Sequence, residues 1–344
     1  MKQYFLKMVM LFCVAIMSSY ANGAVTVDGL TYKLFSGTNT ARLEGYESLN
    51  HELIIPQTIV YEGQEYTVTS IYLRGFFDCT DLTKVTIPCT IKSIKEPNGV
   101  DPEAYRNPFA GCVNLESIEV DEANEWMCSV DGVLFNKDKT KLYAYPAGKK
   151  SNTYSIPEGV SWIGGNAFVE CSNLKSIKMP NSVKTIHTGA FAVCRSLEEM
   201  FFSENATYIN AYTFQGCTRL KHVVIPSMVW GMGEHVFSGC INLEYVIIKA
   251  VIDDVRGDTF SFMPQLTCIL YVPASERRKY SFYAGTVLPL EAYQPTAIND
   301  IPAPQIVNGK SFNGKWYDLS GRRINTTPAR SGVYIHDGKK VVVK

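Results

Sequence analysis

The stretch SIPEGVSWIGGNAFVECSNLKSI (residues 155–177) is followed at once by KMPNSVKTIHTGAFAVCRSLEEM (residues 178–200), and the two align along their whole length without a gap. Three more blocks of the same length continue to residue 269. The aligned blocks share hydrophobic columns. One column is Phe168, Phe191, Phe214, Phe237 and Phe260, and another is Leu174, Leu197, Leu220, Leu243 and Leu266. A third is Ile163, Ile186, Ile209, Met232 and Val255. Columns that stay in register through five blocks indicate an internal repeat.

The same frame continues towards the N-terminus with interruptions. The residues that fit it there include Phe76, Cys79, Leu82, Phe109, Cys112 and Leu115. A period in the low twenties with aliphatic columns is typical of a leucine-rich-repeat solenoid, whose stacked coils share a core that one coil cannot form. The segment LKHVVIP (residues 220–226) predicts the strand of one coil, with Val223 and Ile225 inward and Pro226 at its end. We therefore expect a β-rich solenoid with little helix and about seven to eight coils.

One cysteine recurs once per coil. The column is Cys171, Cys194, Cys217 and Cys240, and Met263 takes its place in the fifth block. A catalytic or metal-binding cysteine should neither recur in every coil nor be replaceable by methionine. Free cysteine packs as a small buried hydrophobe, so we expect buried thiols. Disulfides between neighbouring coils stay open as an alternative, because coils about 4.8 Å apart would permit them by distance.

The N-terminal segment 1–23 has the features of a secretory signal peptide. Lys2 and Lys7 precede the apolar run at residues 8–17, and small residues follow at Ala21 and Gly23. Removing this segment takes two of the 33 basic residues and none of the 33 acidic ones, and it leaves nine cysteines. The resulting charge of about −2, without a Lys/Arg-rich run, argues against a nucleic-acid partner. We expect an exported protein that is associated with the cell surface or outer membrane, or is extracellular.

Composition and pattern divide the chain into several parts. They are a signal peptide (1–23), an N-terminal β cap (24–62), the solenoid (63–285) with a hairpin excursion (near 120–154), a linker (286–313) and a C-terminal β-module (314–344). The cap would cover the hydrophobic end of the first coil, as solenoid termini require. The linker is rich in Pro, Ala, Asn and Gln. No segment after the signal peptide is long and apolar enough to predict a transmembrane helix.

The recurring pattern IP…V…I…AF…C..L..I resembles the BspA-like leucine-rich-repeat proteins, exported surface proteins of Bacteroidetes and some protists. The resemblance covers about Gly63 to Pro273. The flanks VDGLTYKL and LYVPASERRKYSF are similar to the N-terminal cap and to the closing strand and short helix of that family. The resemblance implies adhesion or ligand binding at the cell surface, with no shared catalytic residues. The tail resembles the C-terminal sorting modules of Bacteroidetes but lacks most of their upstream strands. A sorting signal and a plain β-tail are both open.

The outward side of the strands is the usual binding surface of a solenoid. It is polar in the early coils, at Lys84, Thr86, Ser176 and Lys178. Further along it becomes apolar. The candidate ligand-binding residues are Phe201, His222, Val224, Tyr245, Ile247 and Leu270. An exposed apolar strip is normally covered, so we hypothesise that it binds a host or bacterial surface protein, anchored by Phe201 and Tyr245. The alternative is that the chain's own tail, or a second copy, packs there.

The sequence shows no constellation for catalysis, and we expect no enzyme activity, no cofactor and no metal site. The five histidines have no metal-ligand spacing. The strongest enzyme pattern is His222 beside Glu199 on the adjacent strand. This pair would still need a nucleophile and an oxyanion site, and Cys268 lies two strands away, so a hydrolase is only a remote alternative. A carbohydrate-binding module is the closer alternative. Trp162 and Trp230 share neither a column nor adjacent coils, however, so no sugar platform is predicted.

Overall fold

The computed structural model describes residues 23–47, 51–95, 107–255, 258–263, 267–281, 283 and 285–293, and five strands beyond residue 304. The chain forms two compact units, residues 1–291 and 292–344. The expected signal peptide lies outside the described residues except for Gly23, and so does Leu266 of the leucine column. No helix among the described residues is long and apolar enough to cross a membrane.

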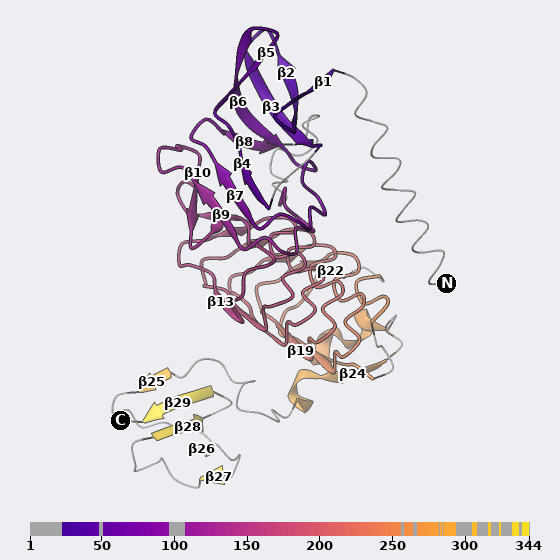
Figure 1. Cartoon of the computed structure of the whole chain (residues 1–344). Helices are drawn as coiled ribbons and strands as arrows, with labels where there is room; N and C mark the ends of the chain where they lie inside the picture. Colours follow the sequence, from indigo (N-terminus) through magenta and orange to yellow (C-terminus); the bar gives the residue numbers. More distant parts are fainter. Residues whose placement is uncertain are drawn as a thin grey trace. The chain divides into compact units, whose positions relative to one another are not determined.

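The N-terminal residues form a sheet with the strand order β1-β2-β3-β6-β5 (Figure 1). Its strands are β1 (Ala24–Val27), β2 (Leu30–Phe35), β3 (Thr40–Tyr46), β5 (Thr58–Tyr61) and β6 (Gln64–Tyr72). In β2, Leu30 and Tyr32 are buried while Lys33 is exposed, the alternation of a half-buried strand. Strand β6 pairs in parallel with β3 and with β8 (Ser93–Lys95). The sheet of the N-terminal residues therefore continues into the first coils.

One parallel ladder contains the strand that was expected in each coil and extends beyond the expected solenoid at both ends. Its strands are β4 (Glu52–Ile54), β7 (Lys84–Ile87), β9 (Ser117–Val120), β13 (Thr153–Ser155), β15 (Ser176–Lys178), β17 (Glu199–Phe201), β19 (His222–Ile225), β21 (Tyr245–Ile248), β23 (Ile269–Val272) and β24 (Thr286–Pro289). They form three sheets, β4-β7-β9, β13-β15-β17 and β19-β21-β23-β24. Equivalent residues of successive repeats pair, as Ile177 does with Met200. Inward residues therefore stack in one core.

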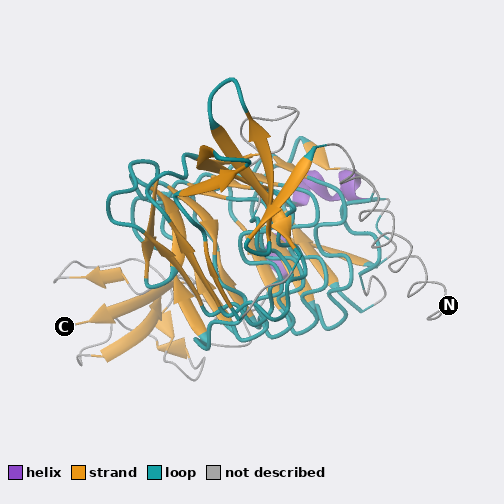
Figure 2. Cartoon of the chain, turned by 45° about the horizontal axis from the view of Figure 1, so that its top comes forward, coloured by secondary structure: helices purple, strands orange, loops and turns teal. Residues whose placement is uncertain are grey.

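A second parallel ladder, which was not predicted from the sequence, also joins the coils. The described chain consists mainly of strands and loops with little helix (Figure 2). The two-residue strands of the second ladder are β14 (Trp162–Ile163), β16 (Thr185–Ile186), β18 (Tyr208–Ile209), β20 (Gly231–Met232) and β22 (Asp254–Val255). They contain the third hydrophobic column. Three longer strands, β10 (Met127–Val130), β11 (Val133–Asn136) and β12 (Lys141–Ala144), head the same sheet as antiparallel hairpins. Strands of two residues carry too little alternation to be recognised in a sequence.

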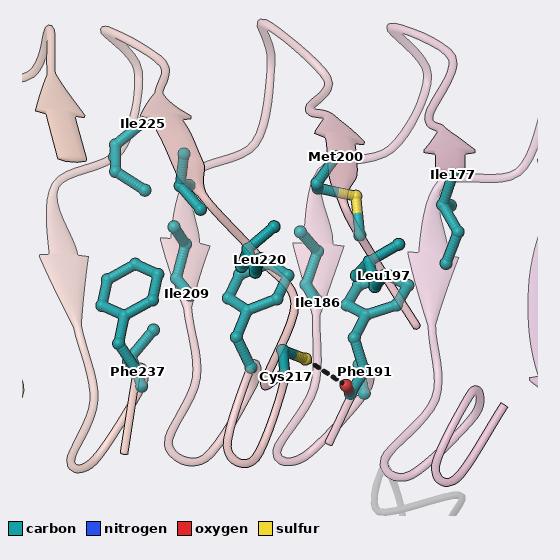
Figure 3. Close-up of a cluster of buried hydrophobic side chains, with 14 of the residues drawn as sticks. Ile177, Ile186, Phe191, Leu197, Met200, Ile209, Cys217, Leu220, Ile225 and Phe237 are labelled. Atoms are coloured by element: carbon teal, nitrogen blue, oxygen red, sulfur yellow. Dashed lines mark hydrogen bonds between the residues drawn. The ribbon is translucent and has the colours of Figure 1, made fainter. Parts of the chain in front are cut away.

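The phenylalanine column forms a continuous stack through the core. The ring centroids of successive members lie 5.1, 5.7, 5.8 and 6.0 Å apart from Phe168 to Phe260, with interplanar angles of 24° or less. All five rings are fully buried. Figure 3 shows Phe191 and Phe237 in this row, beside the leucine and isoleucine columns. Stacked aromatic pairs add to the free energy gained by burying their area, so the column links the coils to one another.

The cysteine column is buried and its thiols are unpaired. All nine cysteines after the signal segment are free, and Cys171, Cys194, Cys217 and Cys240 are at most 1% exposed. The Sγ of Cys217 donates to the carbonyl of Phe191 at 3.1 Å (Figure 3). The thiols of Cys194 and Cys240 donate in the same way to the phenylalanine carbonyl of the preceding coil, at 2.9 and 3.0 Å. The expectation of buried thiols is thus confirmed, and the column also adds a weak hydrogen bond between coils.

The turn that follows the second ladder is held by backbone bonds between coils. The Phe168 N–H donates to the carbonyl of Ala190 at 2.8 Å, and the Phe191 N–H to Thr213 at 3.0 Å. The residue two places after each phenylalanine adopts a left-handed conformation; this column is Glu170, Val193, Gly216, Gly239 and Phe262. A φ of 61° at Val193 is unfavourable for a β-branched side chain. The stacking of the coils therefore imposes this backbone, whichever residue occupies it.

The last coil extends further than was predicted from the sequence. Residues 286–313 were expected to be a linker, but β24 pairs in parallel with β23, and Val287 packs against the core. The 3-10 helix η2 (Ala274–Tyr280) lies between these strands and buries Tyr280, and η3 (Leu290–Ala292) follows β24. The expected closing strand and short helix are present, and one further strand continues the ladder.

The C-terminal unit contains a sheet with the strand order β25-β29-β28-β26-β27. Its strands are β25 (Gln305–Val307), β26 (Trp316–Tyr317), β27 (Arg323–Ile324), β28 (Gly332–His336) and β29 (Lys339–Val343). Four of them fall in the segment expected as a β-module. Strand β25 falls in the expected linker and pairs in parallel with β29.

The stack predicts a large difference between two phenylalanine replacements. Phe214→Ala should lower the free energy of unfolding by about 3–5 kcal/mol, because it leaves a cavity between Phe191 and Phe237. Phe262→Ala is the control, since this side chain is 78% exposed, and it should change stability by less than about 0.5 kcal/mol. Urea unfolding followed by circular dichroism measures both. Equal losses would contradict the assignment of the column to the core.

Thiol labelling tests the cysteine column. Burial raises the pKa of Cys240 to about 12 and the pKa of the Cys217 thiol well above its usual value, so at pH 8 almost no reactive thiolate is present. We expect iodoacetamide to label the partly exposed Cys89 in the native protein, and the partly exposed Cys128 more slowly, because burial also raises the pKa of its thiol. The column should react only in denaturant. Peptide mass spectrometry assigns the sites, and native labelling of Cys217 at the rate of Cys89 would contradict the burial.

Candidate binding surface

Four of the six predicted ligand-binding residues lie on the outer face of the first ladder with some exposure. Phe201 is 44% exposed at the end of β17, and His222, Val224 and Tyr245 are partly exposed on β19 and β21. The rings of His222 and Tyr245 stack at 5.2 Å with an angle of 10°. Since His222 pairs with Tyr245 in the parallel register, the ladder itself holds the two rings together. We call these four residues the outer strip.

The orientation predicted for Leu270 is wrong. Strand β23 pairs with β21 so that Val246 faces Leu270 and Tyr245 faces Ile269. This interval is longer by one position than the interval between β19 and β21. Because the prediction applied the regular repeat length, it placed each residue of β23 on the opposite face. Leu270 and Cys268 belong to the core and are at most 1% exposed. The outward residues of β23 are Ile269 and Tyr271.

The exposure predicted for Ile247 is also wrong. Its side chain is only 4% exposed, although it is not a member of the core cluster that contains Val246 and Ile248. Its neighbours in the ladder are Val224 and Tyr271. The ring of Tyr271 meets that of Tyr245 edge-on at 6.2 Å. Tyr271 therefore replaces Ile247 and Leu270 in the exposed surface, and the row of contacting rings is His222, Tyr245 and Tyr271.

The outer face has a break between β17 and β19, which belong to different sheets. The neighbouring coils have Met179-Pro180 and Ile225-Pro226 at the positions where this coil has Phe202-Ser203. Phe202 packs edge-on against Phe214 at 5.6 Å, and the buried Ser203 accepts a hydrogen bond from the N–H of Asn205 at 3.1 Å. The bulkier turn accompanies the interruption. Phe201 consequently stands at the edge of one sheet and the three rings stand on the next.

The residues of the hydrolase alternative do not converge on a nucleophile. His222 stacks on Tyr245, and Glu199 lies on a strand that is not paired with that of His222. Cys268 is buried in the core, and burial raises the pKa of its thiol to about 12. A thiol attacks as the thiolate. The geometry of these three residues gives no support to cysteine-based hydrolysis.

An aromatic pair on the second ladder was not predicted from the sequence. The rings of Tyr208 and Trp230 lie 4.8 Å apart on adjacent coils, and Trp230 is 51% exposed. Met228 and Val251 are also exposed, at equivalent positions of adjacent coils. We call these four residues the tryptophan patch. It was missed because Trp230 was compared with Trp162 rather than with the tyrosine one coil before it. Trp162 is buried, with the Lys141 Nζ 5.6 Å from its ring centre.

The stacked coils, the two ladders and the repeated columns define the chain as a leucine-rich-repeat solenoid. The family described as BspA type leucine rich repeat region matches residues 61–127 and 139–267 in 6 copies. The chain belongs to this family, which confirms the resemblance inferred from its sequence. No curated protein matches the chain.

Several solved structures resemble the chain. One is a leucine rich cell surface protein from Faecalibacterium prausnitzii, with 21% identity and a TM-score of 0.48 over 76% of this chain and 98% of that chain. Another is the pneumococcal vaccine antigen PcpA, with 19% identity and a TM-score of 0.48 over 78% of this chain and 98% of that chain. A leucine-rich repeat protein from Bacteroides ovatus has 21% identity and a TM-score of 0.41 over 77% of this chain and 76% of that chain.

Proposed function

We propose that the protein is an exported, non-enzymatic recognition module that binds a host or bacterial surface protein through the outer strip and Tyr271. The observation that carries the proposal is the row of contacting rings, His222, Tyr245 and Tyr271, on three successive strands. Aromatic side chains held by a rigid ladder lose little conformational freedom on binding and are enriched among residues that dominate interfaces. Phe201 supplies a further exposed ring across the break.

Export and surface attachment are part of the same proposal. The features of residues 1–23 support export, and membership of a family of surface proteins agrees with it. The C-terminal sheet is proposed either as a sorting signal or as a plain β-tail. Binding by an extended face needs no cofactor. The described cysteines are free thiols, so the proposed function does not depend on disulfide bonds. The proposal therefore rests on surface shape and apolar contact rather than on chemistry.

Replacing two anchors tests the binding surface. We expect Phe201→Ser/Tyr245→Ser to weaken binding to purified extracellular-matrix proteins at least about thirtyfold, because one hot-spot residue contributes about 2 kcal/mol. Surface plasmon resonance on the mature chain gives the dissociation constants. Phe262→Ser is the matched control, since it removes an exposed phenyl ring from a coil turn that lies outside the outer strip, and it should bind like the original protein.

Two outcomes would contradict this assignment. Binding that survives the double replacement would remove the outer strip from the interface. A change in sedimentation from dimer to monomer, without any change in matrix binding, would show that a second copy covers the strip. Loss of binding in the control as well would indicate a general defect and is checked by circular dichroism.

Carbohydrate binding is a second candidate, favoured by the tryptophan patch. A tryptophan beside a tyrosine on adjacent coils offers two neighbouring apolar rings, at a centroid separation of 4.8 Å. Sugars present apolar C–H faces that pack on such rings, and a small number of nearby polar groups fixes their orientation.

A glycan screen separates the two candidates. If the patch binds sugars, Trp230→Ala should abolish the glycan signal on an array, whereas Phe201→Ser/Tyr245→Ser should leave it unchanged. The reason is that Trp230 contributes the larger exposed ring of the pair. Absence of any glycan signal from the original protein, or a signal that is insensitive to Trp230→Ala, would contradict a sugar site at this patch.

A further inference from the structure

Three potential metal ligands meet on the turns between the fourth and fifth coils. One ligand atom from each of Glu234, His235 and Asp258 lies within 4.8 Å of the other two, and all three side chains are partly buried. Among the residues that the structure describes, no other group of three His, Cys, Asp or Glu side chains has such spacing. The group lies apart from the outer strip, because it belongs to the turn that follows the second ladder.

The repeat explains why these residues meet. Asp258 follows His235 by one full repeat, so the two occupy the same place in adjacent coils. The His235 N–H donates to the carbonyl of Asp258 at 3.2 Å, and the Tyr212 N–H donates to the carbonyl of Glu234 at 2.9 Å. The ligand-bearing backbone is therefore fixed by bonds between coils. Spacing along the sequence could not show the site without the coil register.

The imidazole of His235 is held between two aromatic rings. Its centroid lies 5.4 Å from that of Tyr212 and 5.7 Å from that of Phe262. A metal ligand whose side chain is fixed by its surroundings loses less freedom on binding. The left-handed backbone of His235 is no argument for a site, because Asn166 and Tyr212 adopt it at the equivalent position of other coils.

Unsatisfied polar atoms give an independent reason to expect a ligand. The Nδ1 of His235 and the Oδ1 of Asp258 are buried and have no hydrogen-bond partner among the described residues. The same is true of Oγ1 of Thr259, a fully buried side chain that directly follows Asp258. Each buried polar atom without a partner costs about 1–3 kcal/mol. Carboxylates often gather on protein surfaces without a metal ion. Here, in contrast, the histidine and the aspartate each have a buried polar atom without a hydrogen-bond partner.

We propose that Glu234, His235 and Asp258 form a binding site for a divalent transition-metal ion, with Zn²⁺ as the ion that the ligands suit best. Imidazole and carboxylate are both zinc ligands, and three protein ligands leave a position open for water or a partner's side chain. Zinc ligands at about 2.0–2.1 Å stand roughly 3.4 Å apart in a tetrahedron. Because the ligand atoms now lie within 4.8 Å of one another, rotation of the two carboxylates has to bring them closer by at most about 1.4 Å. Two carboxylates also balance the charge of the ion.

Equilibrium dialysis of the untagged mature chain with Co²⁺, as a spectroscopic substitute for Zn²⁺, tests the site. We expect about one Co²⁺ per chain, a visible spectrum without thiolate-to-cobalt charge transfer, and displacement of the cobalt by Zn²⁺. His235→Gln and Asp258→Asn should each weaken Co²⁺ binding at least about tenfold. His187→Gln is the matched control, because this histidine also lies on a coil turn and packs against an aromatic ring, with its centroid 4.5 Å from that of Trp162 and the rings tilted by 51°. It should leave binding unchanged.

Several results would overturn the proposal. They are failure of the original protein to bind Co²⁺, a thiolate charge-transfer band, or an affinity that neither replacement alters while circular dichroism shows intact folding.

Discussion

The fold depends on one constraint, the superposition of equivalent residues in successive coils. Two parallel ladders and the backbone bonds of the turns join each coil to the next, as between Ile177 and Met200, Ile163 and Ile186, and Phe168 and Ala190. Because these bonds fix the register, a side chain that is buried in one coil has its counterpart buried in the next. Equivalent residues of a repeated sequence are therefore expected to contact one another in successive coils. The phenylalanine stack and the cysteine column both follow from this.

The interior could be predicted from the sequence because burial selects hydrophobic residues coil after coil. The described members of the columns of Phe191, Leu197 and Cys194 are buried as expected. The second ladder could not be predicted, because β16 and β18 have two residues each. The outward face was less predictable still. One extra residue between Phe260 and Ile269 reverses which side chains of β23 face outward, and a hydrophobic pattern such as Cys268-Ile269-Leu270-Tyr271 does not show the shift.

Outward residues differ from inward ones in what constrains them. Phe191 and Phe214 must fill the same space, whereas His222 and Tyr245 need only be compatible with the ladder. The ladder still brings outward neighbours together, so any two chemically compatible residues one repeat apart become adjacent. The outer strip, the tryptophan patch and the group around His235 all arise in this way. In each case the decisive neighbour is on the adjacent coil, and comparison within one coil does not reveal it.

The departures from the repeat concentrate near the end of the solenoid. The fifth block has Met263 instead of cysteine, lacks the proline after its first strand and contains the extra residue. A terminal coil is covered on one side by η2 and β24 rather than by another repeat, so its columns need not match the interior ones. This freedom explains why Asp258, Phe262 and Tyr271 differ from their counterparts. Since the same coil completes the row of rings and the group around His235, the end of the solenoid is where a stacked fold has the most scope to acquire a binding site.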